Sequence, residues 1–268
     1  MSKNLEIVSW NLEDKLNDPH LQTSILEVEP DIAVFPEAHP ENTVLDAATT
    51  ARFHNAGYDV YDKDYDDDDG RKDRHSLVVI AKPELVRAAD PVYLVGRHAI
   101  RLTMHDGSEF MGVHLDDRRE RRRLAQAATA VRSLGETAIV AGDLNATYRE
   151  GKWPRVLRAL KPFTYLLPAS EPDPEREGSL GYKLGRPGSL AQRLTGMASG
   201  KTMESFRAAN FIDADRKHVP TKTLGPIGVQ IDHILYRGRV ALERQTSVES
   251  VGNTSDHSRL RATLRVTL

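Results

Sequence analysis

Short apolar runs, each followed by polar or acidic residues, recur along this chain of 268 residues and constrain its fold more than any other feature. Short runs rich in Val, Ile and Phe are typical of buried strands, and several stretches between them have helical spacing. This alternation predicts an α/β or α+β fold. We expect strands at 5–10, 32–35, 76–80, 100–104, 110–114, 138–141, 229–236 and 261–268.

Amphipathic stretches separate many of these runs. The stretch 118–134 is the clearest, because Leu124, Ala127, Val131 and Leu134 recur at intervals of three and four residues. No change in composition marks a second domain, and one α/β domain can fill this length, so we expect a single domain over residues 1–268. Helices are expected at 19–28, 42–56, 118–134, 152–160 and 190–209.

The composition excludes several classes of protein. Lys and Arg number 37 against 39 Asp and Glu, a formal net charge of −2, which excludes a strongly basic nucleic-acid protein of the histone kind. The absence of Cys excludes disulfides, zinc–thiolate sites and a cysteine nucleophile. No signal peptide and no apolar run of 18 residues are visible, so we expect a cytoplasmic protein without membrane contact.

Two segments resemble ligand-binding loops but lack necessary parts. Segment 62–70 holds six Asp in nine residues, yet as a calcium loop starting at Asp64 it has Asp69 at the glycine position and His75 at the position of the final Glu. Segment 195–202 resembles a phosphate-binding loop without its first glycine or a preceding strand. We interpret the first segment as a solvated loop, like 168–188, and the second as a break between helices.

Polar side chains stand at the ends of the predicted strands, where a sheet holds functional groups rigidly. Carboxylates, amides and His in the absence of Cys suit a hard cation such as Mg²⁺, which usually takes one or two protein carboxylates. Glu37 with Glu13 or Asp256 fits that requirement. The complete candidate set is Asn11, Glu13, Glu37, His114, Asp143, Asn145, Asp232, Asp256 and His257.

The candidate residues stand in six short motifs. These are Trp10-Asn11, Pro36-Glu37, His114-Leu115, Gly142-Asp143-Leu144-Asn145, Ile231-Asp232-His233 and Ser255-Asp256-His257. In their order along the chain, these motifs resemble the signatures of the endonuclease/exonuclease/phosphatase superfamily, and the resemblance covers nearly the whole sequence. It implies a four-layer α/β/β/α sandwich, in which two packed mixed sheets are flanked by helices and the active site lies at one edge of both sheets. It also implies a monomer.

The resemblance also implies a role for each residue. Glu37 is then the principal ligand of Mg²⁺, for which Mn²⁺ can substitute, with Asp256 as a second acidic residue and Asn11 and Glu13 flanking the metal. Asp143 orients or deprotonates the attacking water, and Asn145 binds the scissile phosphate. His257 contacts a phosphate oxygen or acts as a base, with Asp232 as its carboxylate partner. His114 assists the phosphate or the leaving group.

The substrate is less well defined by the sequence. Segment 118–123 places five Arg within six residues, and Arg118, Arg119, Arg121 and Arg122 are candidates for contacting a polyanion, although a solvated helix start is the favoured explanation of this run. The leading hypothesis is a Mg²⁺-dependent phosphodiesterase acting on nucleic acid. The alternatives are a phosphatase of small-molecule or lipid-headgroup phosphates and an inactive binding module.

Overall fold

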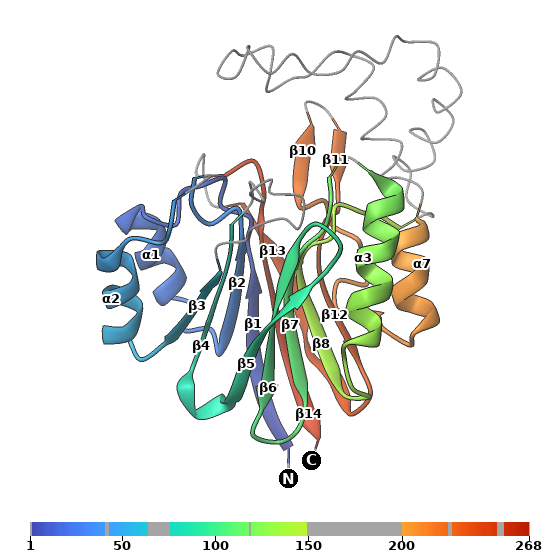
Figure 1. The fold of residues 1–268 in the computed structure, drawn as a ribbon, viewed down its shortest axis with the longest axis horizontal. Coiled ribbons are helices and arrows are strands. Elements are labelled where there is room, and N and C mark those ends of the chain that lie inside the picture. Colours follow the sequence, from blue (N-terminus) through green and yellow to red (C-terminus); the bar gives the residue numbers. More distant parts are fainter. Residues whose placement is uncertain are drawn as a thin grey trace.

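Two six-stranded mixed sheets pack face to face, and helices cover their outer faces (Figure 1). The computed structural model describes residues 2–40, 43–63, 76–117, 119–148, 200–224, 227–250 and 255–267. This architecture confirms the predicted α/β/β/α sandwich. None of the helices within these ranges is long and apolar enough to span a bilayer.

The first sheet has the strand order β13-β14-β1-β2-β4-β3. Strand β1 lies inside the sheet, antiparallel to β14 and parallel to β2. The strands are β1 (Ser2–Ser9), β2 (Ile32–Pro36), β3 (Asp59–Lys63), β4 (Leu77–Ala81), β13 (Val240–Glu249) and β14 (Arg259–Thr267).

The second sheet has the order β5-β6-β7-β8-β12-β9. Strand β8 is parallel to β7 and antiparallel to β12. A separate hairpin is formed by β10 (Lys222–Leu224) and β11 (Ile227–Val229). The strands of the sheet are β5 (Val86–Tyr93), β6 (His98–Met104), β7 (Glu109–His114), β8 (Ala138–Asp143), β9 (Ile212–Asp213) and β12 (Asp232–Arg237).

Three apolar cores separate the four layers. In β2, Ile32 and Val34 face the core between the sheets, whereas Ala33 and Phe35 face the helices, and both sets are buried. A strand buried on both faces reads as a continuous apolar run, which is why the central strands are visible in the sequence. Helices α1 (Pro19–Leu26) and α2 (Ala47–Asn55) cover the first sheet, and α3 (Glu120–Arg132) and α7 (Lys201–Ala208) cover the second (Figure 1).

The sheets approach closely at Gly112 of β7. A Cβ at this position would lie 2.7 Å from Cγ2 of Val79 and 3.0 Å from Cγ2 of Val34, both on the first sheet. Real Cβ contacts are not this short, so only glycine fits without displacing these valines. Because Gly112 is two residues before the end of β7, this contact brings the two sheets together next to His114.

The predicted strands are all present, but the prediction missed the edges of the sheets. Strands β3 and β13 form the edges of the first sheet, and β5 and β9 those of the second. Natural edge strands carry charged residues and Pro, which hide them from an apolar pattern. The predicted strand 229–236 is divided between β11 and β12, and a 3₁₀ turn, η1 (Pro83–Leu85), precedes β5.

Four predicted helices are found, with shorter bounds than expected. They correspond to α1, α2, α3 and α7, the last within a predicted helix 190–209 that is described only from residue 200. The predicted helix 152–160 and the predicted loop 168–188 lie outside the described residues. The predicted acidic loop begins too early, because Asp62 and Lys63 pair with β4 as the end of β3.

Candidate active site

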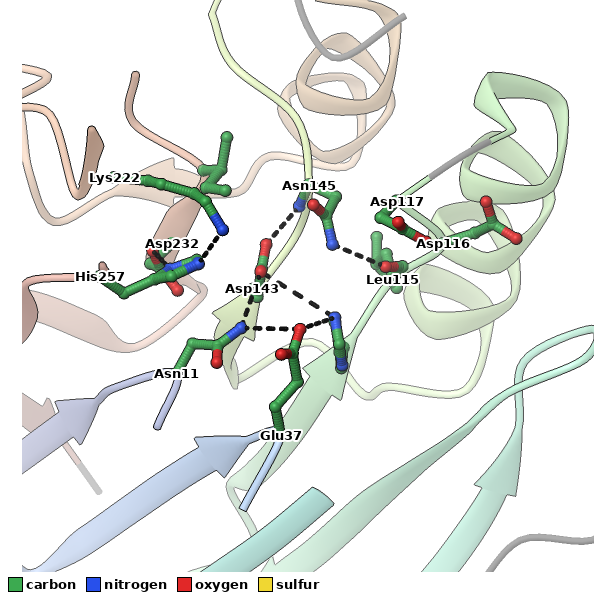
Figure 2. Close-up of polar contacts among 12 residues, drawn as sticks. Asn11, Glu37, Leu115, Asp116, Asp117, Asp143, Asn145, Lys222, Asp232 and His257 are labelled. Carbon is green, nitrogen blue, oxygen red and sulfur yellow. Dashed lines mark hydrogen bonds and ion pairs between the residues drawn. The ribbon is translucent and has the colours of Figure 1, made fainter. Parts of the chain in front are cut away.

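The predicted site residues come together where strands of both sheets end (Figure 2). Asn11 and Glu37 follow the parallel strands β1 and β2 of the first sheet. His114 and Asp143 end the parallel strands β7 and β8 of the second sheet. Because the sheets pack face to face, the four side chains meet at one edge of the sandwich.

Asn11 links the carboxylates of the two sheets. Its Nδ2 lies 3.2 Å from Oε1 of Glu37 and 3.3 Å from Oδ2 of Asp143. Its Oδ1 accepts a hydrogen bond from the backbone N–H of Glu13 at 3.1 Å. The amide of Asn11 is thus engaged by protein groups of both sheets in this structure.

Three of the site residues have a left-handed backbone. Glu13, Glu37 and Asn145 each have φ of 48°. Such conformations cost residues other than glycine about 1–3 kcal/mol. They persist where the surrounding structure holds them, and they cluster at functional sites. At Glu37 the backbone N–H donates to the carbonyl of Ser76 at 2.9 Å, which contributes to holding this turn.

Asp143 is an almost fully buried carboxylate of the site. Its Oδ1 accepts the backbone N–H of Asn145 at 2.8 Å. Burial raises the pKa of Asp143, and the nearby Asp232 raises it further, while His257, Lys222 and the Asn145 N–H lower it, with a net value of about 7. A carboxyl with a pKa near neutrality is suited to accept and release a proton.

His257 and Asp232 form a buried pair. Nδ1 of His257 lies 2.7 Å from Oδ2 of Asp232, and both side chains are almost fully enclosed. Thr221 Oγ1 accepts the backbone N–H of Asp232 at 3.0 Å, and Trp10 Nε1 donates to the carbonyl of His257 at 3.2 Å. Burial lowers the pKa of His257, but Asp232 raises it by charge and hydrogen bond, and the net shift is upward.

Lys222 is a member of the site that the sequence motifs did not reveal. Its Nζ lies 2.9 Å from Nε2 of His257 (Figure 2) and 3.1 Å from Oδ2 of Asp256. Burial lowers the pKa of Lys222, but Asp256 and Asp143 raise it, and the net shift is upward, so it stays an ammonium. An ammonium only donates, so this contact is a hydrogen bond when the His257 ring is neutral and carries its proton on Nδ1, facing Asp232. Once the ring is protonated, Nε2 becomes a donor and its charge repels the ammonium.

The predicted phosphate-facing residues occupy the second sheet's side of the site. Nε2 of His114 lies 3.7 Å from Oε1 of Glu37 and 3.9 Å from Oδ2 of Asp143. Asn145 donates from Nδ2 to the carbonyl of Leu115 at 3.0 Å, and its amide carries a second N–H. Arg97 donates to the same carbonyl at 2.7 Å, so a buried guanidinium supports the turn after β7.

The three predicted metal ligands differ in their surroundings. Glu37 points to Asn11 and His114, as described above. The carboxylate of Asp256 instead faces cations, with Oδ2 3.1 Å from Lys222 and Oδ1 3.4 Å from Nε2 of His257. Glu13 accepts the backbone N–H of Asp256 at 3.2 Å and pairs with Lys15 at 3.4 Å.

Two groups of side chains in the described part of the chain could hold a metal ion. The first is Glu37, His114 and Asp143, and the second is Asp143, Asp232 and His257, and in each group the ligand atoms lie within 4.8 Å of one another. Of the predicted ligands, only Glu37 belongs to either group. His114 and Asp143, expected to act on the substrate, belong to the first one.

The arginine run is not a uniform basic surface. Arg123 is fully buried and donates from Nη1 to the carbonyl of Asp116 at 2.6 Å. Nη1 of Arg122 lies 3.9 Å from Oδ2 of Asp116. Arg119 and Arg121 are exposed, and Arg118 lies outside the described residues. The sequence pattern could not distinguish these environments.

A sequence model of the Endonuclease/Exonuclease/phosphatase family matches residues 8–257, a span that includes every candidate site residue named above. The chain belongs to this family. Family members are hydrolytic phosphoesterases, so this chain is an enzyme of that class and the binding-module alternative is set aside. No curated protein sequence matches the chain.

Solved structures of the family share this fold at low sequence identity. An AP endonuclease from Archaeoglobus fulgidus is 16% identical, with a TM-score of 0.59 over 96% of this chain and 98% of that one. A mannosyl-6-phosphatase from Bacteroides thetaiotaomicron is 15% identical, with a TM-score of 0.57 over 97% and 99%. The 2′,3′-cyclic phosphatase ANGEL2 is 13% identical, with a TM-score of 0.63 over 100% and 97%.

Proposed function

We propose that the protein hydrolyses a phosphodiester bond, in nucleic acid as the first candidate substrate, by direct attack of water in the presence of Mg²⁺. One observation carries this proposal. Asp143 is buried between Asn11 and Asn145, and Glu37, His114 and the Asp232–His257 pair all surround it. A proton acceptor, donors that can bind a phosphate and a carboxylate that can bind a metal are therefore available at and around Asp143.

The donor set fits a divalent cation. Glu37 and Asp143 offer hard carboxylate oxygens, and His114 adds a nitrogen within the same 4.8 Å group. Two carboxylates this close, one of them buried, repel each other unless a cation lies nearby. Burial is the largest cause of the raised pKa of Asp143, and the charge of the Asp232 carboxylate is the second. A cation bound at this group would favour the ionised form of Asp143.

Each residue has a role that its contacts allow. Asp143 positions the attacking water and takes its proton, since it is buried beside Asn11 and Asn145 and next to the candidate metal ligand Glu37. His257, oriented by Asp232, and Lys222 face the phosphoryl oxygens with donors, and the second N–H of Asn145 completes this set. When bound, a divalent ion polarises the phosphoryl oxygen and stabilises charge on the leaving oxygen.

Arg119 and Arg121 support a polynucleotide substrate. Both are exposed near the N-terminus of α3, which follows directly from the loop after His114. Phosphates outside the reacting one can meet these guanidinium groups, and the resulting affinity falls as salt rises. The double variant Arg119→Gln/Arg121→Gln should therefore weaken cleavage of nucleic acid at 150 mM salt. The exposed Arg132, at the other end of the same helix, supplies the matched control Arg132→Gln.

The deciding experiment uses end-labelled single- and double-stranded DNA and RNA, incubated with Mg²⁺ or with EDTA. We expect cleavage with Mg²⁺ that is lost in EDTA and in Asp143→Asn. The exposed Asp90 supplies a control, Asp90→Asn, that should keep wild-type activity. Failure of wild type to cleave any of the four polymers with Mg²⁺ or Mn²⁺ would rule out the nuclease.

A second candidate is hydrolysis of a small-molecule or lipid-headgroup phosphate. It is favoured by the environment of the arginine run, because Arg123 is buried and Arg122 is paired with Asp116. These two arginines are therefore less available to bind a polyanion than the sequence suggests. Hydrolysis of p-nitrophenyl phosphate and bis(p-nitrophenyl) phosphate, without cleavage of the four polymers, would select this candidate.

A further inference from the structure

Lys222 places a partly buried ammonium in direct contact with the imidazole of His257. It starts strand β10, and its backbone forms an isolated bridge with His257. Its ammonium lies between Nε2 of His257 and Oδ2 of Asp256, at 2.9 Å and 3.1 Å. Neither the family resemblance nor the sequence motifs gave this residue a role.

The backbone around Lys222 is fixed by the residues that position the catalytic pair. Thr221 is fully buried, and its Oγ1 accepts the backbone N–H groups of Ile231 and Asp232 at 3.1 Å and 3.0 Å. Its carbonyl accepts the N–H of Ser258 at 2.6 Å. The chain therefore presents the Lys222 side chain from a point attached both to Asp232 and to the segment that carries His257.

The ammonium lies against one of the two candidate metal groups. In the group of Asp143, Asp232 and His257, Nδ1 of His257 is already bonded to Asp232 at 2.7 Å. Nε2 is the remaining ring nitrogen, and Lys222 lies 2.9 Å from it. A divalent cation at Nε2 would be in direct repulsion with this ammonium. In the group of Glu37, His114 and Asp143, the contacts described above join the ligand atoms to Asn11, to the N–H of Asn145 and to one another.

We propose that Lys222 is a built-in cation that takes the place of a second metal ion, so that the protein binds one divalent ion and uses Lys222 to hold a phosphoryl oxygen. This inference rests on the proposed metal-dependent hydrolysis. Asp256 and His257 hold the ammonium in the absence of substrate, and an entering phosphate offers it a charged acceptor in place of Nε2 of His257. Transfer of Lys222 to the phosphate also releases Nε2 of His257 toward the reacting group.

The test is a count of bound ions, which does not depend on turnover. Metal-stripped protein is titrated with Mn²⁺, and the free ion is followed by its electron paramagnetic resonance signal. We expect one Mn²⁺ in wild type, one in Lys222→Arg, which keeps the charge, and two in Lys222→Met, which keeps the length but not the charge. In parallel, the affinity for inorganic phosphate with Mn²⁺ present should fall about tenfold in Lys222→Met but not in Lys222→Arg.

The outcomes separate this inference from the function it rests on. Two ions in wild type, or one ion in both wild type and Lys222→Met, overturn it even if wild type hydrolyses its substrate. An unchanged phosphate affinity in Lys222→Met overturns the substrate contact. Wild type that binds no Mn²⁺ and hydrolyses no ester contradicts the proposed function itself. Near-UV circular dichroism verifies that each variant is folded, and the wild-type count is informative without any variant.

Discussion

Nδ1 of His257 lies 2.7 Å from Oδ2 of Asp232, although the two residues stand at the ends of strands from different sheets. Asp232 is the first residue of β12 in the second sheet, whereas His257 precedes β14 in the first. Their hydrogen bond therefore crosses from one layer of the sandwich to the other at the candidate site. The geometry of the pair depends on how the sheets pack, which makes the site sensitive to changes in the core.

Asp232→Asn should lower kcat by about 10²- to 10⁴-fold, because an amide cannot stabilise positive charge on the imidazole. It should also lower the pKa of His257, since burial then acts without the carboxylate that opposes it. An NMR titration of His257 in metal-free protein measures this shift. Asp213→Asn, which alters the other buried His–Asp pair, is the control and should leave the pKa of His257 in place.

Asp143→Asn should abolish activity and yet stabilise the metal-free protein at neutral pH. Burial and Asp232 raise the pKa of Asp143 to about 7, so the folded state keeps a proton that the unfolded state has lost above pH 4. Wild-type stability should therefore fall between pH 4 and 7. The variant should gain about 1–4 kcal/mol at pH 8 and much less at pH 4. Urea unfolding in EDTA tests this, and a variant destabilised at pH 8 would contradict it.

The pair of His233 and Asp213 should make a contribution to stability that weakens as pH rises. Both ring nitrogens have acceptors, with Asp213 Oδ2 at 2.7 Å and the carbonyl of Ala146 at 2.8 Å. Burial lowers the pKa of His233, but Asp213 and the carbonyl raise it, and the net shift is upward from 6.5. The stabilisation is thus fully present below pH 6.5 and is lost as pH rises through the folded pKa.

Comparison of Asp213→Asn with wild type measures this contribution. The loss of unfolding free energy in the variant should be largest at pH 6 and should shrink at alkaline pH. Urea unfolding at several pH values gives the difference. The exposed Asp90, which pairs with Arg101 at 3.2 Å, supplies the control Asp90→Asn, whose effect should be below about 1 kcal/mol and nearly flat with pH. A pH-independent loss in Asp213→Asn would argue against a charged His233.

Gly142→Ala should prevent stable folding or cost more than about 3 kcal/mol. Gly142 has φ of 140°, and a Cβ there would lie 1.9 Å from the carbonyl oxygen of Val113 on the parallel strand. Gly57→Ala is the matched control, because Gly57 also has a positive φ, of 87°, but nothing within 4 Å of the added Cβ. It should cost only about 1 kcal/mol. Equal losses in thermal unfolding would show that steric contact is not the cause.

The sequence predicted the centre of each sheet better than its edges. Strands such as β2 and β8 are buried on both faces and appear as unbroken apolar runs. Strand β5 lies at an edge, is exposed over most of its length and contains Asp90 and Pro91, so its pattern is indistinguishable from a loop. The pairing of β5 with β6 depends on the tertiary structure, and the local periodicity of the sequence does not encode it.

The candidate site likewise contains residues that the sequence predicted and residues that it did not. Strand-end carboxylates such as Glu37 and Asp143 stand beside apolar runs, so their order along the chain was enough to predict that they meet. Lys222 comes from a short hairpin outside both sheets and belongs to no motif, so only the folded structure brings it to His257. Arg123 shows the converse, because a charged run in the sequence contains a buried residue once α3 packs on the sheet.

The central place of β1 has a consequence for the order in which this protein can form. Its partners in the first sheet are β2, close in the chain, and β14, whose Thr263 bonds to Glu6 across 257 residues. During synthesis, β1 leaves the ribosome before β14, and that half of its hydrogen bonds can form only after β14 has followed. Asn11 and His257 lie beside these two strands, so a nascent chain should have no complete hydrolytic centre until the segment with His257 and β14 has been translated.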